Sequence, residues 1–322
     1  MRNNYDNPRH QNSLVTRREL VSGIAAAAAV STLAPEFAFA ADTQPEQDKP
    51  MPPRTSSFKL SNGVLIPDVG FGTWQIPDGD KAYDSVAFAL ANGYRHIDTA
   101  RAYGNEASVG RAIRDSKLLR DQVFVTSKCP AEIKDAAGAR AAFNATMAAL
   151  QFDKLDLYLI HAPWPWNQRG ADYSKGNVEV WKVFEELYAA GRARSIGVSN
   201  FEVKDLHVVM DKAKVVPMVN QIRYFIGNTE PEVTAFSKAQ HMLVEAYSPL
   251  ATGAVLKNPD LQRIADHYRV SVAQLCIRYP LQKGVLPLPK STTPKYIREN
   301  IDLNFVINAN DMAYLDGLKI DA

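Results

Sequence analysis

The stretch HIDTARAYGNE, residues 96–106, joins a short apolar-rich segment to the start of a helix. It places an acid, Asp98, and a phenol, Tyr103, where a parallel strand would lead into a helix. In barrels of alternating strands and helices, the reactive side chains lie at the carboxyl ends of the strands. The stretch therefore predicts a strand-to-helix junction that carries chemistry.

The same alternation continues on both sides of this junction. Apolar residues recur at helical spacing, as in Ala82, Val86 and Ala89, and Gly93 ends that helix. Strands are predicted at residues 70–74, 94–98, 123–128, 155–161, 195–199, 216–221, 243–248 and 284–288. Eight strands alternating with about eight helices predict an α/β fold, a (β/α)8 barrel of the TIM type.

An open, doubly wound sheet is the alternative architecture. It would normally carry a Gly-x-Gly-x-x-Gly turn after its first strand. The nearest match, residues 70–72, lacks the third glycine, so the barrel is preferred. Ahead of the barrel, two short apolar runs flank Asn62-Gly63, a two-residue turn signal. They predict an N-terminal β-hairpin that caps the bottom of the barrel.

The first forty residues have the pattern of an export signal. A polar start, the pair Arg17-Arg18, an apolar run at 21–33 and a small-x-small motif at 38–40 follow in that order. The paired arginines favour the twin-arginine route, with cleavage after Ala40 and a periplasmic product. An uncleaved anchor is the alternative, but this run is shorter than the roughly 20 residues that span a bilayer.

The predicted organisation is therefore a signal at 1–40, a flexible linker at 41–57 and a barrel at 58–322. The linker prediction rests on a segment rich in proline, glutamine and charge. No stable membrane insertion is expected after cleavage. No exposed apolar stripe requires a partner, so a monomer is expected.

Composition excludes several classes of function. The chain has 322 residues, 46% of them hydrophobic, and a formal net charge of +2. It has no basic field for nucleic acid. Cys129 and Cys276 lack metal-ligand spacing and indicate no disulfide framework, and no metal site is predicted.

Four ionisable residues fall at or just beyond the ends of three successive predicted strands: Asp98, Tyr103, Lys128 and His161. Neighbouring strands lie about 5 Å apart, so these side chains can converge on one pocket. Each residue alone is more often a turn residue, a packing residue or a surface lysine. All four residues together, at the ends of three successive strands, indicate a catalytic site far more specifically than any one of them does.

Together these residues suit the protonation of a carbonyl oxygen. Tyrosine has a pKa near 10, and a Lys128 ammonium is expected to lower it by favouring the phenolate. Asp98 would keep Lys128 charged, and His161 would orient the carbonyl. No side chain carries hydride, so a nicotinamide is implied. A Schiff-base aldolase using Lys128 is an alternative, but it needs a neutral lysine, which Asp98 opposes.

Further motifs are spaced along the chain at residues 98–106, 126–128, 159–161, 197–201, 220–221 and 288–291. With them, residues 58–318 resemble the aldo-keto reductase family, most nearly its bacterial members of the 2,5-diketo-D-gluconate reductase type. The resemblance implies NADPH-dependent reduction of aldehydes or ketones, with Tyr103 as the general acid and NADH as a second cofactor. A regulatory subunit that binds nucleotide with little turnover is the alternative, and the complete catalytic set argues against it.

The resemblance also implies a set of cofactor-binding residues: Thr73, Ser199, Asn200, Gln221, Tyr247, Ser248, Leu250, Lys290, Ser291, Thr292, Glu299 and Asn300. In the family, the positions of Ser199, Asn200 and Gln221 hold the nicotinamide carboxamide, and that of Tyr247 stacks on its ring. The positions of Lys290 and Ser291 hold the adenosine 2′-phosphate.

The sequence departs from the family at two positions, and it ends soon after the last predicted helix. Tyr296 stands where the family often has an arginine that grips the 2′-phosphate, so a weaker preference for NADPH over NADH is expected. Ala162 stands where a tryptophan commonly follows the histidine. Trp74 and Trp164 are the expected aromatic residues of an open substrate pocket.

Overall fold

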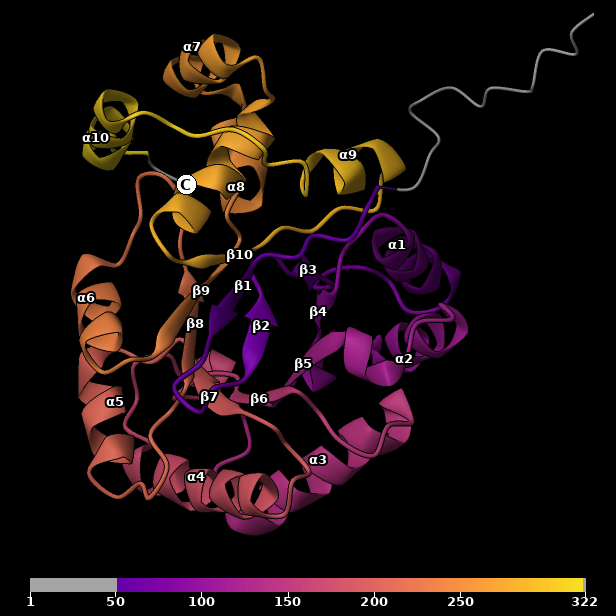
Figure 1. The fold of residues 1–322 in the computed structure, drawn as a ribbon. Coiled ribbons are helices and arrows are strands. Elements are labelled where there is room, and N and C mark those ends of the chain that lie inside the picture. The colour runs from indigo at the N-terminus through magenta and orange to yellow at the C-terminus, as the bar shows by residue number, and fades with distance from the viewer. Residues whose placement is uncertain (1–50, 321–322) are drawn as a thin grey trace, which may run out of the picture. The chain divides into compact units, whose positions relative to one another are not determined.

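The computed structural model describes residues 51–320 (Figure 1). The predicted export signal and residues 41–50 of the predicted linker lie outside the described residues. Residues 51–56 have no regular secondary structure, yet they are held to the domain. Arg54 donates two hydrogen bonds to Asp68, at 2.6 and 2.9 Å, and Met51 packs against the core. This part of the predicted linker therefore belongs to the folded domain.

Eight parallel strands form the barrel, which confirms the predicted fold. They are β3 (Phe71–Gly72), β4 (His96–Asp98), β5 (Phe124–Cys129), β6 (Leu157–Ile160), β7 (Ile196–Ser199), β8 (Val219–Arg223), β9 (Leu243–Tyr247) and β10 (Leu286–Leu288). Each strand pairs with the next one along the chain. The backbone N–H groups of Gly70 and Gly72 donate to the carbonyls of Pro287 and Pro289, at 3.0 and 2.9 Å. These bonds join the first strand to the last.

Helices surround the strands, and all but the last of them follow in chain order (Figure 1). They are α1 (Asp80–Ala91), α2 (Glu106–Asp115), α3 (Ala136–Leu150), α4 (Ser174–Ala189), α5 (Val203–Met210), α6 (Pro231–Ala239), α7 (Pro259–Tyr268), α8 (Val272–Gln282), α9 (Pro294–Glu299) and α10 (Ala309–Gly317). The predicted apolar face of α1 is buried. α7 ends at Arg269, which takes a left-handed conformation, and Ser271 caps the start of α8 through Gln274.

The predicted hairpin is present as β1 (Ser57–Lys59) and β2 (Leu65–Pro67), which pair antiparallel. Its turn, residues 60–64, is longer than the two residues expected from Asn62-Gly63. The Leu60 N–H bonds the Val64 carbonyl, and Gly63 has a φ of +87°. The Asn62 amide donates to the carbonyl of Arg194, just before β7. The hairpin therefore covers the amino ends of the strands and leaves their carboxyl ends for a site.

Asn105 occupies the N-cap position of α2, but its side chain does not cap the helix. The Asn105 amide donates to the carbonyls of Thr73 and Ile76, at 2.9 Å each, and its oxygen accepts from the Thr99 hydroxyl. It therefore ties the loop after β3 to the loop after β4.

None of the helices within residues 51–320 combines the length and the apolar character that a membrane crossing requires.

Gly70 leaves no room for a side chain at the closure of the barrel. A Cβ there would lie 2.4 Å from Leu288 Cδ2 and 2.6 Å from His96 Nδ1. We expect Gly70→Ala to lower the free energy of unfolding by about 1–3 kcal/mol, as other overpacked cores do. Urea unfolding measures this. Gly317→Ala, where a Cβ meets nothing within 4 Å, should change stability by less than about 0.5 kcal/mol. If Gly70→Ala changed the free energy of unfolding as little as Gly317→Ala does, the barrel would not be tightly closed at Gly70.

Candidate active site

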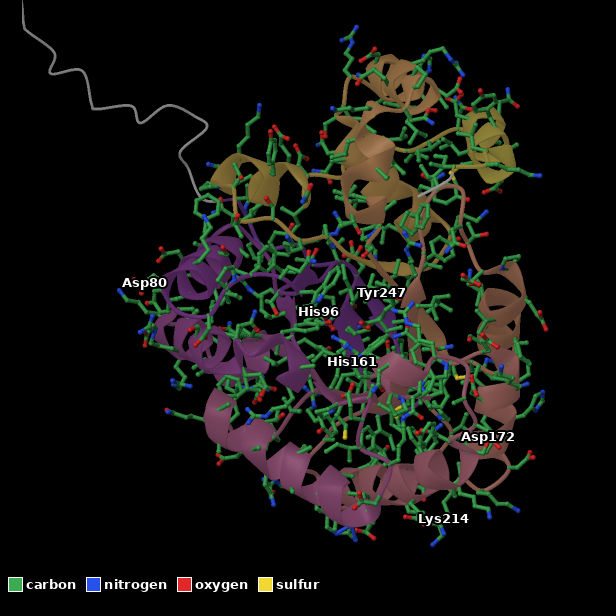
Figure 2. All side chains as sticks on the ribbon, turned by 180° about the vertical axis from the view of Figure 1, so that it is seen from behind. Asp80, His96, His161, Asp172, Lys214 and Tyr247 are labelled. Carbon is green, nitrogen blue, oxygen red and sulfur yellow. The ribbon has the colours of Figure 1, made fainter. Side chains whose placement is uncertain are left out.

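A cavity of about 1000 Å³ opens at the carboxyl ends of the strands. Three of the four predicted catalytic residues, Asp98, Tyr103 and His161, line it. Lys128 is fully buried and lies behind the wall. In Figure 2, His161 and Tyr247 lie inside the ring of helices, whereas Asp80 and Lys214 lie toward its outside. The structure thus brings the four predicted residues together at one end of the barrel.

Lys128 and Asp98 form a buried ion pair. Asp98 ends β4 and lies beside Thr126 of β5, so Lys128, two residues later, projects on the same side. The Lys128 ammonium donates to both carboxylate oxygens of Asp98, at 2.7 and 2.8 Å, and to the Thr99 carbonyl at 2.9 Å. The ammonium is therefore held by oxygen atoms of β4 and of the residue that follows it.

The ion pair keeps Lys128 charged. Burial by itself would lower the pKa of Lys128, but the charge of Asp98 and its hydrogen bonds raise this pKa above its usual value. A buried, fully bonded ammonium is not a nucleophile. This arrangement argues against the Schiff-base aldolase alternative.

Tyr103 lies against both Lys128 and His161. The Lys128 nitrogen is 5.0 Å from the centre of the Tyr103 ring, and the Tyr103 and His161 rings meet edge to face at 5.6 Å. Burial raises the pKa of Tyr103 to about 12, although the charge of Lys128 acts in the opposite direction. The expected lowering by Lys128 is thus present, but burial outweighs it, and the net pKa of Tyr103 lies above its usual value. The phenol stays protonated at neutral pH and can donate.

His161 presents a neutral imidazole to the cavity. Burial and the charge of Lys128 lower the pKa of His161 to about 3. Its Nδ1 has no hydrogen-bond partner within residues 51–320. Trp166 packs at a right angle to the ring, with 5.3 Å between ring centres. A neutral imidazole that is packed between Tyr103 and Trp166 can donate one N–H to a carbonyl oxygen. That oxygen would lie next to the phenol of Tyr103.

Gln221 connects Asp98 to a second buried carboxyl group, that of Glu245. The Gln221 amide nitrogen donates to Asp98 at 2.9 Å and to Glu245 at 2.7 Å. Burial, and then the charge of Asp98, raise the pKa of Glu245 to about 8. Because both N–H groups of the side-chain amide are used inward, its oxygen, Oε1, is the atom left for a ligand in the cavity.

Sequence reasoning missed Glu245. Its only sequence signal is an acid inside the otherwise apolar strand Leu243–Tyr247.

Most of the predicted cofactor-binding residues line this same cavity: Ser199, Asn200, Gln221, Tyr247, Ser248, Leu250, Lys290, Ser291, Glu299 and Asn300. Thr73 and Thr292 do not. Thr73 is fully buried, and its hydroxyl donates to the Asp98 carbonyl at 3.0 Å. Thr73 therefore supports the end of β4 and does not face a ligand.

The predicted substrate-pocket residues divide in the same way. Trp74 lines the cavity, but Trp164 does not, and Trp166 takes its place on the wall. Trp164 packs edge to face behind Trp166, at 5.4 Å. The sequence could not distinguish these two tryptophans, because the turn between them decides which one faces inward.

Several wall segments hold non-glycine residues in left-handed backbone conformations. Asn200, Ser248 and Thr252 have φ values of 61°, 51° and 57° and all line the cavity. Such conformations cost free energy and persist where the surrounding structure fixes them. The Asn200 amide donates to the His161 carbonyl at 2.9 Å, and its oxygen accepts from the Tyr247 hydroxyl at 2.7 Å.

Other wall residues come from segments whose course the sequence did not predict. The 3-10 segment η5 (Ala251–Lys257) was not expected. The wall residues that were not predicted include Gln75, Trp166, Arg169, Thr252, Leu256, Gln262 and Ser271. No local sequence pattern identifies them, because loops from different strands meet here.

Comparison with known proteins agrees with this geometry. A model of the "Aldo/keto reductase family" matches residues 68–320. Glyoxal reductase of Bacillus subtilis (strain 168) is 41% identical over 266 residues, covering 82% of this chain and 93% of that protein. The 9,11-endoperoxide prostaglandin H2 reductase of Trypanosoma cruzi (strain CL Brener) is 36% identical over 266 residues, covering 81% and 91% of the two chains.

Solved structures show the same fold. An aldo/keto reductase from Brucella melitensis superposes with a TM-score of 0.76 at 38% identity, covering 81% of this chain and 98% of that one. An aldo-keto reductase complexed with NADPH superposes with a TM-score of 0.75 at 29% identity, covering 82% and 88%.

Glu245→Gln should change how stability depends on pH. The Glu245 pKa is about 8 in the folded protein and about 4.3 for an unperturbed glutamate. The folded state therefore holds a proton that the unfolded state releases, and this group destabilises the wild type as pH rises from 5 to 8. Its contribution is at most about 1.4 kcal/mol per pH unit. The variant has no such proton, so its stability relative to wild type should rise over this range.

Urea unfolding at pH 5, 6.5 and 8 measures this difference. Glu179→Gln, on an exposed face of α4, is the matched control and should differ from wild type by a constant amount. A constant difference for Glu245→Gln as well would contradict a protonated Glu245.

Proposed function

Because the chain belongs to the aldo/keto reductase family, whose members are NAD(P)H-dependent oxidoreductases, we propose that it reduces aldehydes and ketones to alcohols with Tyr103 as the proton donor. One observation carries this proposal. A protonated phenol and a neutral imidazole face each other on the cavity wall, over a buried Lys128–Asp98 ion pair.

The proposed chemistry uses each member of this set. Bound NADPH supplies the hydride to the carbonyl carbon. His161 donates an N–H to the carbonyl oxygen and fixes its position. Tyr103 transfers its proton to that oxygen as negative charge develops, and the resulting phenolate is stabilised by the Lys128 ammonium 5.0 Å from its ring. Asp98 holds Lys128 charged throughout, and a solvent proton restores the phenol.

The cavity fits a nicotinamide dinucleotide. The side-chain oxygen of Gln221, Oε1, can accept a hydrogen bond from the NH2 group of the nicotinamide carboxamide. The hydroxyl of Tyr247 is anchored on Asn200, which holds its ring at the wall in a position to stack. Lys290 lines the cavity and makes no ion pair within residues 51–320, so it can bind the 2′-phosphate. Tyr296 also lines the cavity, and without an arginine there we expect NADH to be accepted as well.

Small aldehydes and dicarbonyls are the proposed substrates. A glyoxal reductase is among the relatives at 41% identity, and Trp74 and Trp166 line the same cavity as Tyr103 and His161. The nearer resemblance to bacterial 2,5-diketo-D-gluconate reductases remains a prediction. Activity on a panel of glyoxal, methylglyoxal and benzaldehydes, each with NADPH and with NADH, will rank the substrates and the two cofactors.

Tyr103→Phe should abolish turnover and spare nucleotide binding. The variant lacks the proton donor, so kcat should fall by about 10³-fold or more, while the Kd for NADPH changes by less than about twofold. NADPH absorbance follows turnover, and fluorescence quenching follows binding. Tyr83→Phe is the control, because the Tyr83 hydroxyl bonds Asp115 on the helical ring.

Retained activity in Tyr103→Phe would refute the proposed acid. Tight NADPH binding by the wild type, with no turnover across the panel, would favour the regulatory alternative.

We further propose that residues 1–40 direct export by the twin-arginine route, with cleavage after Ala40. The support is the sequence pattern alone. This route carries folded proteins, so a nucleotide could be bound before export. In a bacterial host, replacing Arg17 and Arg18 with lysine should leave the full-length protein in the cytoplasm, whereas the wild type should reach the periplasm with Ala41 as its first residue. Cell fractionation and N-terminal sequencing test this, and unchanged export of the variant would exclude the route.

A further inference from the structure

Arg169 is a cation on the cavity wall that the proposed catalytic and cofactor sets do not use. It directly follows the short 3-10 segment Trp166–Gln168 in the loop after β6. Its guanidinium carbon lies 5.5 Å from the centre of the Trp164 ring and 5.3 Å from that of Trp166. Trp166 also packs on His161. Arg169 is therefore separated by a single aromatic ring from the group that would orient the substrate carbonyl.

The guanidinium makes no hydrogen bond and no ion pair within the part of the chain that the structure describes. Guanidinium groups that lie over aromatic rings keep their in-plane N–H donors available. A planar fork of donors matches the two oxygens of a carboxylate. An arginine placed in this way is ready to bind an anion.

The start of the loop that carries Arg169 is tied to α4 and to the loop after β5. Before it, the Lys134 ammonium donates to the Ala162 carbonyl and to the side chain of Asn177, each at 2.8 Å. Asn177 in turn donates to the Pro163 carbonyl. After Gln168, the Ala171 N–H bonds the Gln168 carbonyl at 3.1 Å. These bonds fix the start of the loop and a turn around Arg169, whose exposed side chain lies against Trp164 and Trp166.

The charges on the wall are divided between two regions. Lys290 and Glu299 follow β10, in the region proposed for the adenosine end of the nucleotide, and Asp98 is neutralised by Lys128. Among the described wall residues, this leaves Arg169 as the charged side chain beside His161. Its charge reaches Tyr247, where Arg169 and Arg223 lower the pKa of the phenol against the larger effect of burial, and Glu230 raises it.

We propose that Arg169 is a subsite for a carboxylate on the substrate, so that this enzyme prefers carbonyl compounds that also carry a carboxylate. The inference rests on the proposed reductase function and names the substrate class for the same site. With the carbonyl oxygen at Tyr103 and His161, the acid group lies beyond the face of Trp166. Short aldehyde acids and aromatic aldehyde acids have this form.

The test compares anionic substrates with neutral ones of the same shape. The pairs are succinate semialdehyde with methyl 4-oxobutanoate, and 4-carboxybenzaldehyde with 4-formylbenzamide. The wild type should show a kcat/KM at least about 10-fold higher for the acid in at least one pair, and added salt should reduce this ratio. Arg169→Gln should lower kcat/KM for the acid by about 10-fold or more, mainly through KM, and leave the neutral compound within about twofold. Arg169→Lys should retain part of the preference for the acid, since lysine keeps the positive charge but lacks the planar pair of N–H donors.

Arg111→Gln is the matched control. Arg111 also lies over an aromatic ring, 4.4 Å from the centre of Tyr83, but on the outer helices, and its loss should leave the ratio unchanged. An unchanged ratio in Arg169→Gln overturns the inference and leaves the reductase function intact. If Arg169→Gln lowers kcat/KM equally for acid and neutral substrates, Arg169 serves the fold and the inference is overturned. If the variant raises the KM for NADPH, Arg169 serves the cofactor and the inference is overturned as well. A wild type that reduces glyoxal or methylglyoxal but none of the four compounds overturns the inference and leaves the reductase function intact. A wild type that reduces none of the compounds in either set refutes the reductase function, and the inference with it.

Discussion

A charged lysine lies inside the barrel with no exposure to solvent, and the site depends on how that charge is compensated. Removing an ammonium from water costs several kcal/mol, and only close opposite charge with full hydrogen bonding offsets this. Lys128 obtains both from Asp98 and the Thr99 carbonyl. The ends of β4 and β5 must therefore keep their register. Thr73, Asn105 and the backbone closure at Gly72 hold the loops around that end in place.

The other ionisable groups near this pair are kept neutral. Burial lowers the pKa of both His96 and His161 to about 3, and it raises the pKa of Tyr103 to about 12 and that of Glu245 to about 8. One ion pair is thus surrounded by uncharged donors and acceptors. In such surroundings, the loss of one proton from Tyr103 is felt strongly by Lys128, because the fully buried ammonium lies 5.0 Å from the centre of the Tyr103 ring. The same burial that raises the Tyr103 pKa strengthens the attraction that stabilises its phenolate.

Much of this site could be predicted from the sequence because strand ends in a parallel barrel are neighbours in space. Asp98, Lys128 and His161 each end a predicted strand, and placing the strands was enough to bring them together. Trp166, Arg169 and the segment Ala251–Lys257 could not be placed, because their positions depend on left-handed residues and on contacts between loops from different strands. Glu245 is buried in an apolar strand, where its role depends on Gln221 of the neighbouring strand. The effect of Lys128 on the Tyr103 pKa could be predicted, but its net direction could not, because a sequence names a charged neighbour and does not give the depth of burial.

The positions of the cationic residues suggest how one cavity can order two ligands. Lys290 follows β10, Arg169 follows β6, and the neutral pair of Tyr103 and His161 lies with the latter, next to Trp166. With the proposed roles, Lys290 would meet the phosphate of an anionic nucleotide at one end of the cavity, and Arg169 would meet the carboxylate of an anionic substrate near the reacting group. If both cations lay beside His161, a nucleotide phosphate could compete for the substrate position. Because the two cations are separated, each anionic ligand would bind in one orientation, with its negative group at its own cation. The proton donor, Tyr103, stays uncharged until the reaction begins.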